Sequence, residues 1–224
     1  MLISFGRQSI LTVIAVVLCL GNSAAFAVEK GDWLLRLRGI GIVPTDDSSS
    51  ITPDLLTSGL DPQAAIVPEI DITYMVTKNI GIELIAATSK HDFDGLGPAL
   101  GGLDGVAEAW LLPPTLLLQY HFLPDGKFRP YVGAGINYTI TYAENAQRSL
   151  ENILGPTKVT ADNSLGWAVQ AGFDYELNER WFLNFDVKYI TINVDMKLDS
   201  GGTIRRIDQG IDPVVIGVGI GYRF

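Results

Sequence analysis

The stretch that decides the fold runs from Leu165 to Tyr189 and reads LGWAVQAGFDYELNERWFLNFDVKY. In its first half every second residue is apolar, while Gln170, Asp174 and Glu176 occupy the other phase. After a polar turn at 178–180, the apolar phase resumes at every second position up to Tyr189. A two-residue period places alternate side chains on opposite faces of a β-strand. The stretch therefore predicts two antiparallel strands joined by a tight turn.

The same alternation recurs along the chain. Further strands are predicted at 31–43, 66–76, 80–91, 109–122, 130–142 and in a last segment that ends at 224. After Tyr189 the phase blurs, which fits either a bulge or an extension of the strand beyond the membrane. Eight strands satisfy the even-number rule of outer-membrane barrels. The predicted fold class is all-β, an eight-stranded antiparallel transmembrane β-barrel, closed because unpaired strand edges in hydrocarbon would be costly.

The connections between the predicted strands alternate in length. Three are tight turns, whereas those at about 44–65, 92–108, 144–163 and 199–209 are long and polar. Outer-membrane barrels have short periplasmic turns and longer external loops. The pattern therefore predicts that both termini are periplasmic and that the four long loops lie outside the cell.

The N-terminal segment has the pattern of a secretory signal. Arg7 precedes an apolar run at 10–20, and Ala25-Phe26-Ala27 supplies a cleavage site. The alternative is a membrane anchor, but Gly21, Asn22 and Ser23 break the run short of the roughly 20 apolar residues that a spanning helix needs. We expect a removed signal peptide at 1–27 and a barrel domain at 28–224. The lone cysteine, Cys19, would be removed too, so the mature chain would carry no disulfide.

Composition limits the partners. The formal net charge is −9 and the sequence has no cluster of Lys and Arg, which argues against a nucleic-acid partner. The apolar content of 47% and the mean hydropathy of +0.25 are high for a soluble globular chain and fit a barrel whose outer face meets lipid.

Aromatic residues gather at the predicted strand ends, where interfacial belts are expected. They include Trp33, Trp110, Tyr120, Phe122, Tyr131, Tyr175, Trp181, Tyr222 and Phe224. The last strand ends in alternating apolar residues with a terminal aromatic, Tyr222 and Phe224. This ending resembles the signal by which the barrel-assembly machinery recognises outer-membrane barrels.

The inward phase of the predicted strands is polar and charged. The expected lumen polar network comprises Arg36, Arg38, Glu69, Asp71, Glu83, Gln119, His121, Asp174, Asp186 and Lys188. Because unpaired ions in low dielectric are costly, we expect these charges to satisfy one another; a proton or ion relay is the alternative. Neighbouring carboxylates two residues apart only share a strand face, and the two histidines, His91 and His121, have no ligand cluster around them. No catalytic residue, metal site or cofactor is predicted.

The segment 110–122, WLLPPTLLLQYHF, followed by RPYVGAGINY at 129–138, resembles the centre of outer membrane protein W family sequences. The Pro-Pro-Thr run is its most specific part, and GDW at 31–33, NERWFLN at 178–184 and GYRF at 221–224 extend the resemblance along the chain. The resemblance implies a monomeric barrel that passes small hydrophobic molecules across the lipopolysaccharide layer and releases them sideways into the membrane lipid. A structural barrel, or a receptor or adhesin acting through its loops, is the alternative.

Two groups of residues carry the mechanistic hypothesis. Proline removes a ladder hydrogen-bond donor, so Pro113 and Pro114 predict a local break in the wall that could form the lateral exit. Ordinary barrel curvature is the alternative. Apolar residues of the long loops are the candidates for the entrance, namely Leu55, Leu56, Leu60, Leu96, Leu100 and Leu103.

Overall fold

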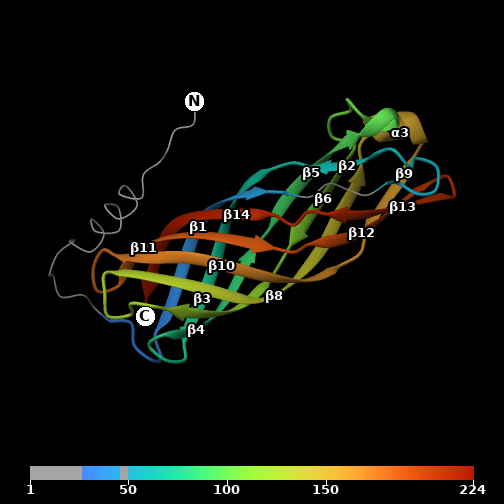
Figure 1. Cartoon of the computed structure of the whole chain (residues 1–224). Helices are drawn as coiled ribbons and strands as arrows, with labels where there is room; N and C mark the ends of the chain where they lie inside the picture. The colour runs from blue at the N-terminus through green and yellow to red at the C-terminus, as the bar shows by residue number, and fades with distance from the viewer. Residues whose placement is uncertain (1–26, 46–49) are drawn as a thin grey trace, which may run out of the picture.

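The computed structural model describes residues 27–45 and 50–224, so nearly all of the expected signal peptide lies outside the described residues. Eight strands form an antiparallel sheet in the order β10-β11-β14-β1-β3-β4-β7-β8, and the pairing of β8 with β10 closes it into a barrel (Figure 1). These strands are β1 (Trp33–Val43), β3 (Ala65–Met75), β4 (Ile80–Ala87), β7 (Thr115–His121), β8 (Phe128–Ala146), β10 (Ser164–Glu176), β11 (Trp181–Ile190) and β14 (Val214–Arg223). The prediction of an eight-stranded antiparallel barrel is confirmed.

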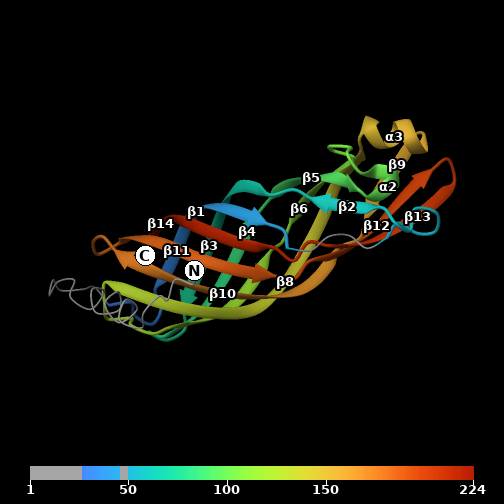
Figure 2. The same cartoon turned by 45° about the horizontal axis from the view of Figure 1, so that its top comes forward.

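The two ends of the barrel differ. At the turn end, short connections at 76–79, 122–127 and 177–180 join the strands, and the C-terminus lies there (Figure 2). At the opposite loop end the sheet continues beyond the ring. The loop end contains β2 (Gly59–Pro62), β5 (Ser89–Leu96), α2 (Gly97–Leu100), β6 (Ala107–Leu112), α3 (Arg148–Leu154), β9 (Thr157–Ala161), β12 (Asn193–Ser200) and β13 (Thr203–Gly210).

The expectation of four long polar loops at about 44–65, 92–108, 144–163 and 199–209 is therefore wrong in part, because each of them contains a strand or a helix. The segment 199–209 lies in the β12–β13 hairpin, and β9 pairs with β12. Alternate side chains of these strands, such as Val194, Met196 and Ile207, are buried in the same core as the upper barrel, which supplies the apolar contact that a projecting hairpin needs. Among the described residues, no helix is long and apolar enough to cross a membrane.

The blurred phase after Tyr189 marks an extension. β11 ends at Ile190, and β12 begins at Asn193 and pairs with β13 and β9 instead of the barrel wall. At the break, the Ile192 amide donates to the Asp212 carboxylate at 2.8 Å, so a side chain replaces a strand partner. The residues after Tyr189 therefore extend the chain into a further strand, β12, and do not form a bulge within β11.

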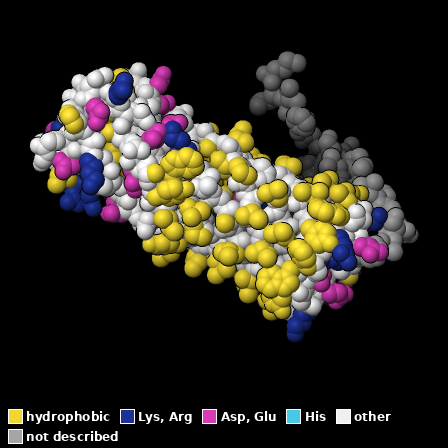
Figure 3. All heavy atoms as spheres, turned by 180° about the vertical axis from the view of Figure 1, so that it is seen from behind, with side chains coloured by type: hydrophobic (Ala, Val, Ile, Leu, Met, Phe, Trp, Pro, Cys, Tyr) yellow, Lys and Arg dark blue, Asp and Glu magenta, His cyan; other side chains and the backbone are white. Residues whose placement is uncertain are grey.

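The outer face of the barrel forms an apolar belt. Hydrophobic side chains cover the middle of the molecule, while charged side chains collect toward its two ends (Figure 3). At the turn end aromatic rings pack in pairs on this face, with centroids 4.8 Å apart for Trp33 and Tyr74 and 4.9 Å apart for Trp181 and Tyr222. Tyr131 is an exception to the predicted aromatic belt. It is 1% exposed and points inward, because it lies in the opposite phase to its exposed neighbour Val132.

The position of the belt can be tested with one charge. Val218, in the middle of β14, is 61% exposed on the belt, and Ile204, on β13 of the loop end, is 54% exposed. We expect Val218→Arg to lower the free energy of unfolding in lipid by about 2–4 kcal/mol, as for a lipid-facing cation at the bilayer midplane. Ile204→Arg should change it by less than about 1 kcal/mol, because that side chain would face water. Equal losses in urea titrations of the two variants would contradict this placement.

Candidate functional site

The inward side chains of the lower barrel form one ion-pair network. Arg36 contacts Asp71 at 2.8 Å, Asp174 at 3.1 Å and Glu83 at 3.3 Å. Arg38 contacts Glu69 at 2.8 Å and Asp71 at 2.7 Å. All of these side chains are at most 3% exposed. They come from β1, β3, β4 and β10, so the network ties strands on several sides of the barrel together.

A third cation, Lys188, completes the network. Lys188, on β11, bridges Glu69 at 2.8 Å and Asp186 at 2.9 Å, and Asp186 also contacts Arg38 at 2.9 Å. Gly217 leaves the space for this cluster, because a Cβ atom there would meet the Asp186 carboxylate. Gln119 and His121 lie next to the network, with the His121 Nε2 atom 3.1 Å from Gln119 Oε1. The structure thus brings all ten predicted lumen residues inside the barrel.

Three further residues, Asn184, Tyr131 and Arg129, lie inside the barrel although the sequence did not single them out for the lumen, whereas Gln170 and Glu176 had been placed in the polar phase. Asn184 donates to the Tyr131 hydroxyl at 2.9 Å and to Asp174 at 2.9 Å, and Gln170 donates to Glu83 at 2.6 Å. Arg129 pairs with Glu176 at 2.8 Å. Asn184 shares the phase of Asp186 and Lys188, so phase alone was enough to find it.

An apolar plug lies between the network and the turn end. It consists of Val28, Leu34, Met75 and Phe182, all at most 1% exposed. The Arg36 guanidinium lies 5.6 Å from the centre of the Phe182 ring. The strand phases reflect this layering, since the buried positions of β1 run from Leu34 through Arg36 and Arg38 to Ile40 and Ile42. The lumen is filled by side chains from the network to the turn end.

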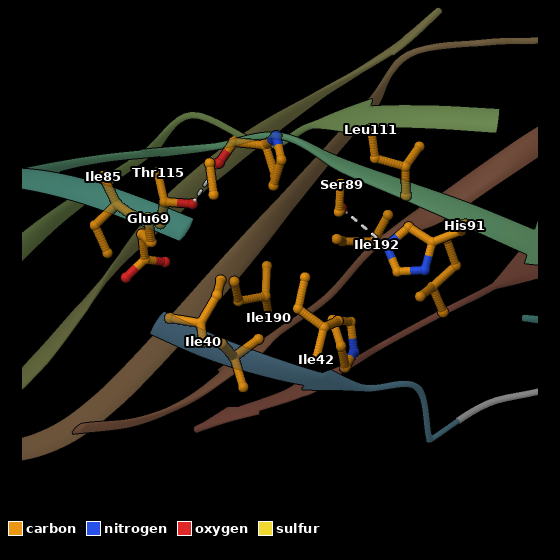
Figure 4. Close-up of a pocket in the computed structure, with 15 residues that line it drawn as sticks. Ile40, Ile42, Glu69, Ile85, Ser89, His91, Leu111, Thr115, Ile190 and Ile192 are labelled. Atoms are coloured by element: carbon orange, nitrogen blue, oxygen red, sulfur yellow. Dashed lines mark hydrogen bonds between the residues drawn. The ribbon is translucent and has the colours of Figure 1, made fainter. Parts of the chain in front are cut away.

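Above the network the barrel holds a narrow apolar cavity with a volume of about 30 Å³, which widens through its mouth toward the loop end. Its lining is mostly aliphatic: Ile40, Ile42, Ile85, Ala87, Leu111, Pro113, Ile190, Ile192, Ile211, Pro213 and Val215. The polar members are Glu69, Ser89, His91 and Thr115. Figure 4 shows Ser89 and His91 at one end, Glu69 and Thr115 at the other, and Ile40, Ile42 and Ile190 between them. The cavity suits an apolar molecule.

The barrel wall beside this cavity has a break in its hydrogen-bond ladder. β4 pairs with β7 as far as Ile85 opposite Thr115, and β5 pairs with β6 from Ser89 opposite Leu111. Between these pairs, no ladder pairing joins 86–88 to 112–114 in the described structure. Pro113 and Pro114 have no amide hydrogen to donate there. We call this the wall break.

An outer groove lies on the lipid-facing side of the wall break. It encloses about 610 Å³ of largely open space and is lined by Leu37, Pro68, Glu69, Ile70, Ala86, Ala87, Thr88 and Leu112. Glu69 and Ala87 line both the groove and the apolar cavity. At this point the cavity and the groove therefore lie on opposite sides of the same two wall residues.

None of the six predicted entrance leucines lines the cavity. Leu96 is half-buried at the end of β5, opposite Gly59 of β2. Leu60 and Leu100 are fully buried in the core of the loop end, and Leu55 and Leu103 pack against that core. Leu56 is exposed. An open entrance built from Leu60 and Leu100 is a wrong prediction, because these side chains hold the loop-end segments together with Phe93 and Ile51.

Charged contacts shape the loop-end surface. Arg205 donates two hydrogen bonds to Asp54, which lower the pKa of that carboxyl. Asp195 lies opposite Asp208 in the β12–β13 register, and the hydrogen bond between these carboxyls raises the pKa of Asp195. In the ranges that the structure describes, no group of three or more His, Cys, Asp or Glu side chains is placed to hold a metal ion.

The geometry agrees with the comparisons with known proteins. The model of the OmpW family matches residues 29–224. The chain belongs to the OmpW family. It is 42% identical over 200 residues to the uncharacterized outer-membrane protein y4mB of Sinorhizobium fredii, covering 88% of this chain and 82% of that protein. Outer membrane protein W of Vibrio cholerae is 35% identical over 215 residues, or 94% and 97% of the two chains.

A solved structure of an OmpW-like barrel superposes closely. The crystal structure of the outer membrane protein OprG from Pseudomonas aeruginosa matches with a TM-score of 0.81 and 30% identity. The match covers 89% of this chain and 99% of that one.

The lumen network should dominate the electrostatic contribution to stability. We expect Arg36→Met to lower the free energy of unfolding by about 3–5 kcal/mol, because Asp71, Asp174 and Glu83 would keep buried charges without their partner. The matched control is Lys78→Met, which removes an exposed pair with Asp125 and should cost at most about 1 kcal/mol. Urea unfolding in lipid vesicles measures both. A loss of similar size in the two variants would contradict the structural role of the network.

Proposed function

We propose that this OmpW-family barrel is a passive conduit for small hydrophobic molecules in the outer membrane of a Gram-negative cell. A molecule would enter the apolar cavity from the loop end and leave through the wall break into the membrane. The observation that carries this proposal is that Glu69 and Ala87 line both the cavity and the outer groove. Pro113 and Pro114 form the opposite edge of the exit.

The filled lower lumen supports a sideways route. Below the cavity, a solute on a straight path would meet Arg36, Arg38 and Lys188 with their carboxylates, and then the apolar plug. Separating these ion pairs around an apolar molecule would leave charges unpaired and without water, at a cost of several kcal/mol for each ion. The wall break offers an exit that separates no ion pair of the network.

We further propose that the loop end faces out of the cell and that both termini are periplasmic. Short turns at one end and long connections at the other support this orientation. The barrel would then contact membrane lipid through its belt and lipopolysaccharide near the loop end. Phe224, 68% exposed beside Tyr222, is the candidate signal for the barrel-assembly machinery, and we propose that the barrel is a monomer.

A receptor or adhesin role through the loop end is the second candidate. Leu56, Ile153 and Ile204 are exposed there, and exposed apolar side chains can mark a protein contact. This role would not require the cavity or the wall break, so variants of the exit distinguish the two functions.

Ala87 is the residue with which to block the exit. We expect Ala87→Trp to reduce the initial rate of octane uptake by whole cells to that of cells without the protein, because an indole would fill the space shared by the cavity and the groove. Gas chromatography of the cell fraction measures the rate. Ala171→Trp is the control, since Ala171 is exposed on β10, away from the groove lining. Unchanged uptake in Ala87→Trp, at equal amounts of folded barrel, would contradict lateral release at this point.

The prolines provide a separate test of the wall break. Replacing Pro113 and Pro114 with Val restores two amide donors, so that the ladder can close toward residues 86–88. We expect octane uptake to fall several-fold while heat-modifiable migration of the folded barrel is kept. If uptake is unaltered, the prolines serve barrel curvature alone.

A further inference from the structure

The apolar cavity has few polar atoms. The hydrogen bonds that these atoms already make determine whether each can still donate or accept a hydrogen bond from a solute. His91 and Ser89 lie on β5 at one end of the cavity, where both side chains are buried. His91 Nδ1 is 3.2 Å from the carbonyl oxygen of Gln63, and a carbonyl can only accept, so Nδ1 carries the hydrogen. Burial lowers the pKa of the His91 imidazole, which keeps the ring neutral and leaves Nε2 as an acceptor.

The neutral ring determines the direction of the next hydrogen bond. Ser89 Oγ is 2.9 Å from His91 Nε2, so the Ser89 hydroxyl must donate to the ring. A hydroxyl has one hydrogen and two lone pairs, and the Ser89 hydrogen is now used. What Ser89 offers to the cavity is therefore an acceptor.

At the other end of the cavity the side-chain hydrogen-bond donors are also already used. The Thr115 hydroxyl donates to the carbonyl oxygen of Pro113 at 3.0 Å. Glu69 accepts from Lys188 and pairs with Arg38, and its carboxylate has no hydrogen to give when ionised. The remaining lining side chains are aliphatic or proline. Across the described lining, every side-chain donor is committed and only acceptors are open.

We propose that the preferred solute of this cavity is a neutral apolar molecule with one hydroxyl group, an alcohol or a phenol, whose hydroxyl donates to Ser89 Oγ. This assignment rests on the proposed conduit function and adds its solute class. The aliphatic body lies among Ile40, Ile42, Ile190 and Ile192, between the two polar ends. An ether or ketone of the same size finds no free side-chain donor in the lining, and a carboxylate ion would lose its hydration without gaining such a donor.

The test compares two isomers. 1-Octanol and heptyl methyl ether have the same formula, but only the alcohol can donate a hydrogen bond. The mature protein in lipid nanodiscs is loaded with the fluorescent apolar probe N-phenyl-1-naphthylamine, and octane, the alcohol and the ether are titrated as competitors. Nanodiscs without protein correct for partition into lipid. We expect 1-octanol to displace the probe at a concentration about 2- to 10-fold lower than the ether, the range for one net hydrogen bond.

Three variants test the residues. Ser89→Ala should bring the alcohol-to-ether ratio close to one, whereas Ser89→Thr, which keeps a hydroxyl, should retain most of it. His91→Phe should also lower the ratio, because the freed Ser89 hydrogen could then be donated to the ether oxygen. Ser149→Ala is the matched control, since Ser149 donates to the Gly105 carbonyl on the loop end outside the cavity.

The outcomes separate this inference from the function on which it rests. If octane and both isomers displace the probe but the alcohol has no advantage in the wild type, or Ser89→Ala keeps that advantage, the assignment to a hydroxyl-bearing solute is overturned and the conduit stands. If none of the three competes beyond the protein-free nanodiscs, the conduit proposal fails together with the assignment.

Discussion

The pairing of β8 with β10 is the contact on which the rest of the molecule depends. It joins residues 128–139 to 164–175 and turns an open sheet into a ring. In hydrocarbon, an unpaired strand edge would leave amide and carbonyl groups without partners, at several kcal/mol for each group. Closure removes that cost, and it also fixes which side chains face lipid and which face the interior.

Once the ring is closed, the charged side chains inside it must find partners of opposite charge within the barrel. The charged side chains of the inward phase share a narrow space, where each buried ion needs a partner of opposite sign. Arg36 and Arg38, two residues apart on β1, contact carboxylates from β3, β4, β10 and β11. The inward side chains of β1 therefore form three layers. Leu34 lies in the plug, the two arginines lie in the network, and Ile40 and Ile42 line the cavity.

Much of the barrel was predictable because the two-residue period is a local property of the sequence. The strand at 31–43 and the hairpin at 165–189 agree closely with β1, β10 and β11. The charged lumen residues were predictable for the same reason. Tyr131 was placed in the belt because it is an aromatic residue near a strand end, although its two-residue phase points inward.

The loop end and the cavity depend on contacts between distant segments, which a local pattern does not contain. Leu60 and Leu100 became buried because β2, α2 and β5 pack together at the loop end. The cavity is assembled from Ile40, Leu111, Ile190 and Val215, which belong to four separate strands. Pro113 was identified from the sequence because proline has a fixed backbone chemistry, whereas Ala87, its counterpart across the wall break, has no such signature.

The ion-paired lower lumen also bears on how much polar solute could leak through the barrel. Water-filled pores let salts, small metabolites and many polar toxins equilibrate between the medium and the periplasm, so every added copy increases the leak. Here the space from the network to the turn end is occupied by paired charges and the side chains of the plug. In the proposed conduit, this filled end would let a cell make more copies of the barrel without opening a water-filled path through each one.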